Sequence, residues 1–145
     1  MKSWANSKPE RPASDASLLL LRVASALAFL YHGSAILLGF FGGPGPERFA
    51  IQHHWPVILG YLVGLAQFAG GLAMATGVFV RLGAASIAVV MLGAIVLVHL
   101  PHGFDVNNGG IEYAMTQLLI ALALLLAGPG TYSLASRLPA RLQKW

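Results

Sequence analysis

The residues of this sequence that could carry out chemistry are few, and histidine is prominent among them. Five histidines occur among 145 residues, and His32 lies inside a long apolar segment, about 14 Å before its predicted end at Phe41. An imidazole there can donate a hydrogen bond or carry a proton to a ligand, or ligate a metal or haem. The alternative is that it bonds a neighbouring helix and serves packing alone. Because ionisable residues inside apolar spans mark functional sites, His32 is the first candidate.

Glu112 and Gln67 are the next candidates. Glu112 begins another apolar segment, where the positive end of a helix dipole favours a carboxylate, so a helix-start role competes with a site role. If Glu112 packs against His99 or His32, the pair could hold and relay a proton. Gln67 can donate and accept at once, as a quinone headgroup or a helix partner requires. We predict His32 and Glu112 as catalytic residues, and His32, Gln67, His99 and Glu112 as ligand-binding residues.

Two histidine pairs raise the question of a metal site. His99 and His102 flank Pro101, which interrupts the helix on which both rings would have to lie. The adjacent His53 and His54 precede a tryptophan and are typical of an interfacial loop with an aromatic anchor. A haem held between His32 and His99 is a further alternative that nothing nearby demands. We predict no metal site, and either histidine pair keeps metal binding as its alternative, as the bundle keeps haem.

The composition excludes several classes of protein. Hydrophobic residues make up 57% of the chain and charged residues 10%, whereas about a quarter of residues are charged in soluble domains, so a water-soluble protein is excluded. No cysteine occurs, which excludes disulfides, thiolate metal sites and a cysteine persulfide. The formal net charge is +4, but the basic residues lie at the chain ends and in one short turn instead of along one face. Nucleic-acid binding is therefore not expected.

Apolar helices must position the candidate residues. A membrane-spanning helix needs about 20 mainly apolar residues, and four stretches meet or approach that length. They are residues 18–41, 56–80, 82–100 and 111–127. We predict an all-α, polytopic membrane protein built as a four-helix antiparallel bundle over residues 18–135. Residues 1–17 form a flexible cytoplasmic tail in this prediction, and residues 136–145 form a basic tail.

The positions of lysine and arginine predict the orientation in the membrane. They cluster before or at the start of the first helix, at Arg81 and after the fourth helix, so both termini are expected to be cytoplasmic. Arg48 alone lies on the opposite side. All five histidines then fall in the outer half of the bundle, together with Glu47, Asp105 and Glu112. Arg22, one turn into the first helix, is expected to snorkel to the inner headgroups.

Small residues predict which helix faces pack. Lipid provides no hydrophobic drive between helices, so close approach of backbones at small residues must hold them together. The expected rows are Ser25, Ala28, His32, Ala35 and Gly39 in the first helix, and Gly60, Gly64, Gln67, Gly71 and Met74 in the second. We expect these rows to face each other or a partner helix.

Several short motifs in order resemble the DoxX family of small membrane proteins. They are residues 21–23, 29–33, 39–45, 102–104, 108–114 and 128–134, and the resemblance covers about residues 17 to 135. The family often has a lysine soon after the His-Gly pair of residues 32 and 33, where this chain has Ile36. The resemblance implies an electron-transfer setting, because relatives include the membrane subunit of a thiosulfate:quinone oxidoreductase.

The sequence and the resemblance together favour one function. We expect a multi-pass subunit of a quinone-linked oxidoreductase in the bacterial cytoplasmic membrane, with a quinone headgroup bound near the outer leaflet. A partner subunit would supply the electrons, and a homo-oligomer is an alternative partner. A non-catalytic scaffold that anchors a redox or stress-response complex is the competing interpretation. A proton-coupled carrier is favoured less, because the chain has no inverted repeats and no broken mid-membrane helices.

Overall fold

A computed structural model describes residues 12–139, and every regular element among these residues is helical. The main helices are α1 (Pro12–Leu38), α2 (Gly45–Gln52), α3 (Val57–Thr76), α4 (Val80–Ala94) and α5 (Glu112–Ala127). A π-helical turn, Ile95–His99, and a 3-10 turn, Leu100–His102, continue α4. Further 3-10 turns occur at Phe40–Gly42, Val106–Asn108 and Leu134–Arg137. Most of the tails predicted at 1–17 and 136–145 lies outside the described residues.

Three of these helical segments are long and apolar enough to cross a membrane. They are Ser14–Leu38, Val57–Thr76 and Val80–His102, and the apolar α5 is shorter, with 16 residues. At 1.5 Å per residue, α5 is about 24 Å long, whereas a bilayer core is about 30 Å thick. The prediction of several apolar helices is thus confirmed.

The helix boundaries differ from the predicted ones for local reasons. α1 begins at Pro12, inside the predicted flexible tail, and proline is well suited to a first helical turn. α1 ends at Leu38 because Gly39 and Phe41 both have positive φ, so His32 lies about 9 Å before the helix end. α3 ends at Thr76 because Gly77 adopts a left-handed conformation, with φ of 75°. The stretch 42–55 between the first two predicted helices contains the short helix α2.

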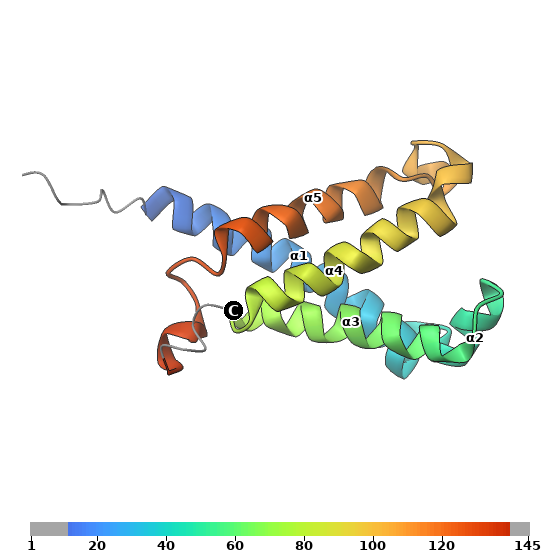
Figure 1. The fold of residues 1–145 in the computed structure, drawn as a ribbon, viewed down its shortest axis with the longest axis horizontal. Helices are drawn as coiled ribbons and strands as arrows, with labels where there is room; N and C mark the ends of the chain where they lie inside the picture. The colour runs from blue at the N-terminus through green and yellow to red at the C-terminus, as the bar shows by residue number, and fades with distance from the viewer. Residues whose placement is uncertain (1–11, 140–145) are drawn as a thin grey trace, which may run out of the picture.

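The bundle has two different ends (Figure 1). We call one the turn end: it holds the start of α1, the tight connection 77–79 between α3 and α4, and residues 128–139. We call the other the loop end: it holds α2 and the connection 100–111. Successive long helices run in opposite directions between these ends, and both ends of the described chain lie at the turn end.

Glycines hold α1 and α3 in close contact. A Cβ atom on Gly64 would lie 2.9 Å from the backbone nitrogen of Leu37, and one on Gly71 would lie 2.8 Å from that of Leu30. A Cβ atom on Gly33 would collide with the backbone of Phe68. The α3 row of small residues therefore packs on α1 as expected. On α1 the glycine contacts run through Leu30, Gly33 and Leu37, and not through the predicted row that contains His32.

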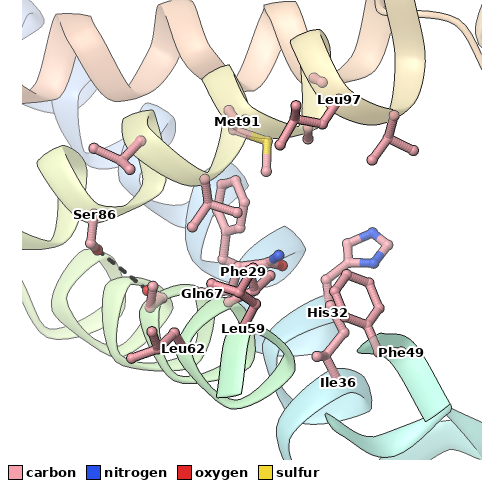
Figure 2. Close-up of a pocket in the computed structure, with 18 of the residues that line it drawn as sticks. Phe29, His32, Ile36, Phe49, Leu59, Leu62, Gln67, Ser86, Met91 and Leu97 are labelled. Carbon is pink, nitrogen blue, oxygen red and sulfur yellow. Dashed lines mark hydrogen bonds between the residues drawn. The ribbon is translucent and has the colours of Figure 1, made fainter. Parts of the chain in front are cut away.

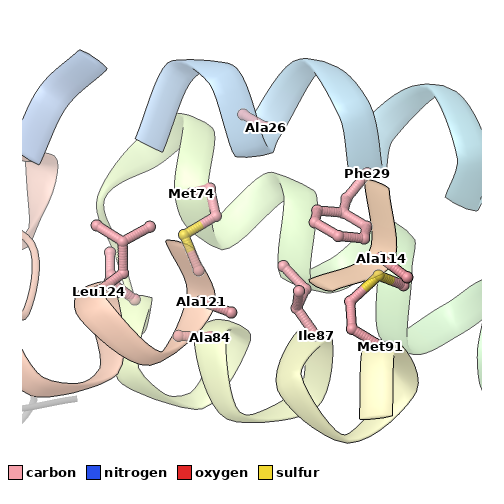
Figure 3. Packing of buried hydrophobic residues seen from close by; sticks show 10 residues of the cluster. Ala26, Phe29, Met74, Ala84, Ile87, Met91, Ala114, Ala121 and Leu124 are labelled. Atoms are coloured by element: carbon pink, nitrogen blue, oxygen red, sulfur yellow. The ribbon is translucent and has the colours of Figure 1, made fainter. Parts of the chain in front are cut away.

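The apolar core lies between the four long helices (Figure 3). Each helix contributes large or small buried residues, and Figure 3 shows Phe29 of α1 close to Ile87, Met91 and Ala114. The cluster consists of Ala26, Phe29, Met74, Val80, Ala84, Ile87, Met91, Ala114, Ala121 and Leu124. Burial of these side chains fixes how the helices are rotated, and therefore which residues are left to face other spaces.

Arg22 does not snorkel, which corrects the expectation from sequence. Its side chain is 1% exposed. Its guanidinium donates hydrogen bonds to the backbone oxygens of Met74 (2.9 Å), Pro129 (3.0 Å) and Tyr132 (2.6 Å). A positive charge is favoured at a helix C-terminus, where backbone oxygens lack partners, and Met74 lies in the last turn of α3. Arg22 therefore joins α1, the end of α3 and the segment after α5.

Candidate functional site

A cavity of about 990 Å³ lies in the loop-end half of the bundle. The α1/α3 pair forms one side and α4 with the start of α5 forms the other, while α2 and Trp55 close the loop end. Figure 2 shows Met91 of α4 and Leu97 of the following π-helical turn on the side of the cavity opposite His32 and Gln67. Most of the lining is apolar, and its polar side chains are His32, His53, Trp55, Gln67, Ser86, His99 and Tyr113. An apolar cavity of this size with a few polar groups is typical of a small-molecule site.

The cavity exists because α3 and α4 are held together only near the turn end. A Cβ atom on Gly83 would lie 3.3 Å from the backbone oxygen of Gly70, so these glycines permit a close helix crossing. Farther along, the Ser86 hydroxyl lies 3.3 Å from the Ala66 oxygen and 2.8 Å from the Gly83 oxygen. Beyond Ser86 the two helices separate, and a Cβ atom on Gly93 would have no neighbour within 4 Å.

His32 faces this cavity from α1. Phe29 and Ile36, three residues before it and four after it, line the same cavity because they share its helix face. The His32 ring contacts the rings of Tyr31 (5.3 Å between centroids) and Tyr113 (6.0 Å). Its ring nitrogens make no hydrogen bond with any residue in the range 12–139. Both nitrogens are therefore available to a ligand.

Gln67 lies at the deep end of the cavity, on α3. The residue is only 6% exposed, yet within the described part of the chain its amide forms no hydrogen bond. The amide atoms of Gln67 still have accessible surface, because they reach the open space of the cavity. A ligand or water that both donates and accepts hydrogen bonds would satisfy this amide. Gln67 thus marks the place in the cavity where a polar group fits best.

Two histidines at the loop end of the cavity each use one ring nitrogen in a hydrogen bond to a backbone oxygen. The Nδ1 atom of His53 lies 2.8 Å from the Phe49 backbone oxygen, and that of His99 lies 2.6 Å from the Gly109 backbone oxygen. A carbonyl oxygen only accepts, so Nδ1 carries the proton in both rings. In the neutral ring, Nε2 then carries no proton and can accept a hydrogen bond. The bond at Nδ1 fixes this tautomer. The loop end of the cavity accordingly offers two imidazole acceptors.

Glu112 lies outside the lining of the cavity. Its Oε2 accepts a hydrogen bond from the Val106 backbone nitrogen at 3.2 Å, so the carboxylate ties the 103–110 loop to the start of α5. Within the described residues Glu112 makes no ion pair or hydrogen bond with His32 or His99. The structure therefore brings together His32, Gln67 and His99 and leaves Glu112 apart. Its contact to the site is indirect, through the loop that carries the Gly109 oxygen.

The remaining histidines, His54 and His102, lie apart from the cavity lining. No group of three or more histidine or acidic side chains is close enough to hold an ion within residues 12–139. The Nδ1 atom of His102 bonds the Val98 backbone oxygen at 3.0 Å, and His102 does not line the cavity. His54 is exposed, next to His53 but not part of the lining.

Sequence reasoning overlooked several polar lining residues. Tyr113 follows Glu112 directly, and its ring is the one that meets His32 across the cavity. His53 lies between Phe49 and Trp55, with ring centroids 4.5 and 4.8 Å away. The spacing of four between Phe49 and His53 is a helical signal that a loop assignment hides. Ser86 has no such signal, because its place depends on the crossing of α3 and α4.

Comparison with known proteins gives two matches. The family model named DoxX matches residues 17–100. A protein of Bacillus subtilis (strain 168), named "Putative oxidoreductase CatD", is 30% identical over 110 residues, which cover 76% of this chain and 78% of that protein. No solved structure matches the chain.

Proposed function

The chain belongs to the DoxX family of membrane proteins, and from this membership we propose that it is the membrane subunit of a quinone-linked oxidoreductase, with the quinone headgroup bound in the cavity. The observation that carries the proposal is the Gln67 amide, which makes no hydrogen bond within the described residues and lines the same cavity as the free His32 ring. The oxidoreductase name of the Bacillus relative supports the reaction class.

The chemistry of the lining suits a quinone in both redox forms. A quinone has a flat apolar ring with two carbonyl oxygens that accept hydrogen bonds, and the quinol has two hydroxyls that also donate. The Gln67 amide can do both, and the Nε2 atoms of His53 and His99 accept from a hydroxyl. Phe29, Phe49 and Tyr113 offer aromatic faces for the ring. We assign hydrogen bonding to the headgroup to Gln67, His32 and His99.

Reduction of a quinone takes up two electrons and two protons. The chain has no cysteine that could deliver electrons as a thiolate, so we assign the electron donor to a partner subunit. His32 is positioned to pass a proton to a ligand oxygen, because its ring nitrogens are free and face the cavity. In this proposal Glu112 is a positioning residue: it holds the loop whose Gly109 oxygen orients His99.

We also propose that α5 is a fourth crossing and that the loop end faces outward. Arg22, Arg81 and Arg137 lie at the turn end, and Arg48 is the arginine of the loop end. This bias favours a cytoplasmic turn end in a bacterial cytoplasmic membrane. A 16-residue helix can cross with little tilt where the bilayer thins locally. The quinone headgroup would then lie in the outer half of the membrane.

Titration of the purified protein with ubiquinone and menaquinone analogues tests the proposed function. We expect saturable binding that is weakened at least tenfold by Gln67→Leu and by His32→Ala. An absorption spectrum of the same sample would reveal haem through its Soret band. A protein that binds no quinone and retains a partner protein in native mass spectrometry would favour the scaffold function instead.

A further inference from the structure

The cavity is open at its side, between two membrane helices. Four of its apolar lining residues are exposed: Leu59 (38%) and Leu62 (52%) on α3, Val89 (72%) on α4, and Leu97 (66%) in the π-helical turn that continues α4. Both helices belong to segments that are apolar and long enough to cross a membrane. Side chains that line a cavity and are also exposed on spanning helices form a rim that faces lipid. We call these four residues the lateral rim.

The helix backbone keeps this side open. The close glycine contact and the Ser86 bond hold α3 to α4 only in the turn-end half. Gly93 contributes no side chain to fill the gap. The π-helical turn Ile95–His99 widens α4 at the same level, and its Leu97, Val98 and His99 all line the cavity. In a regular α-helix the directions of three successive side chains span about 200° around the helix axis. π turns are frequent at functional sites.

Polarity changes along the route from rim to interior. The lateral rim is entirely apolar, whereas the buried Gln67 and the exposed His32 line the same cavity with unused hydrogen-bonding groups. A ligand that satisfies both regions has a polar head and a hydrocarbon tail. The tail would replace lipid contacts at the rim while the head reaches the amide.

We propose that the ligand enters sideways from the bilayer between α3 and α4, and that its hydrocarbon tail lies across the lateral rim while its headgroup is bound. This inference rests on the proposed quinone function and specifies the substrate class: a quinone that carries an isoprenoid tail, taken from the membrane and not from the aqueous phase. Val89 and Leu97 then contact the tail alone, and Gln67 and His32 contact the head alone.

The test blocks the rim and compares two ligands. Val89→Trp and Leu97→Trp place a large ring at the rim, and Leu92→Trp is the matched control, because Leu92 is 55% exposed on α4 and is absent from the cavity lining. Each protein is placed in phosphatidylethanolamine/phosphatidylglycerol nanodiscs. Binding of a radiolabelled long-tailed ubiquinone and of its tail-free ring analogue is then measured, with empty nanodiscs as the blank. For each ligand, the affinity of the variant is divided by that of the wild type, so the partition of that ligand into lipid cancels.

We expect Val89→Trp and Leu97→Trp to weaken binding of the tailed quinone at least tenfold and to leave the tail-free analogue within twofold of wild type. Leu92→Trp should leave both within twofold. Unchanged binding of the tailed quinone in both rim variants would overturn lateral entry while the proposed function stands. Equal weakening of both ligands would also overturn it, since the rim would then belong to the head site. A wild-type protein that binds neither ligand would overturn the proposed function and this inference together.

Discussion

The His32 ring on α1 and the Tyr113 ring on α5 lie 6.0 Å apart, centroid to centroid, with an angle of 55° between their planes. The two residues are 81 positions apart in sequence and come from helices at opposite sides of the cavity. Neither side chain makes a hydrogen bond within the described residues. A ligand placed between Gln67 and the loop end would therefore pass next to both rings, and this arrangement leads to the first prediction.

His32→Ala should weaken quinone binding at least tenfold, because a free imidazole that faces the cavity is removed. Loss of one hydrogen bond of about 1.4 kcal/mol corresponds to that factor. Tyr113→Phe should have a smaller effect, about two- to fivefold, if only the hydroxyl is lost. His54→Ala is the control, because His54 is exposed and outside the lining. Equilibrium titration with a menaquinone analogue measures all three, and equal affinities of wild type and His32→Ala would contradict the assignment.

Gln67→Leu should weaken quinone binding without lowering the stability of the protein. The Gln67 amide makes no hydrogen bond within the described residues, so an apolar side chain of similar size should leave the thermal midpoint within a few degrees of wild type. Quinone binding should fall at least tenfold in the same variant. Thermal unfolding in detergent and ligand titration on one preparation give the two values.

Gln117→Leu is the matched control for that experiment. Gln117 is 7% exposed, its Oε1 atom is buried without a partner in the described structure, and it does not line the cavity. The change removes this buried acceptor, so it should stabilise the protein slightly and leave quinone affinity within twofold. A loss of binding in Gln117→Leu equal to that in Gln67→Leu would show that the cavity is not the ligand site.

Arg22→Met should destabilise the protein by about 3 kcal/mol or more. The change deprives the backbone oxygens of Met74, Pro129 and Tyr132 of a charged donor, and hydrogen bonds to charged groups contribute about 1.5 to 3 kcal/mol each. Arg22→Lys should recover only part of the loss, since one ammonium cannot reach all the oxygens in the same fork geometry. Arg137→Met, at an exposed position of the turn end, is the control. Unfolding in sodium dodecyl sulfate compares the four proteins.

The sequence predicts several apolar helices and three of the residues that line the cavity, because hydropathy and residue type are local properties. His32, Gln67 and His99 are rare polar groups within or at the edge of apolar segments, and that rarity alone selects them. It cannot separate them from Glu112, whose carboxylate turns to the Val106 nitrogen instead of the cavity. The role of Arg22 depends on the segment 128–133 folding back on α1, which no local pattern encodes. Tyr113 and Ser86 likewise depend on how the helices are rotated and crossed.

A comparison of two glycines tests whether close backbone packing holds α1 to α3 and leaves α4 free at the rim. A Cβ atom on Gly33 would lie 2.7 Å from the Cα atom of Phe68, a backbone atom that cannot move aside, so Gly33→Ala should destabilise the protein by about 2 kcal/mol or more. Gly93→Ala meets nothing within 4 Å and replaces a helical glycine, so it should stabilise by roughly 0.5 to 1 kcal/mol. We expect the two substitutions to change the free energy of unfolding in opposite directions in the same assay. Equal destabilisation by both substitutions would mean that α4 closes on α3 near Gly93, and the side opening of the cavity would then be lost.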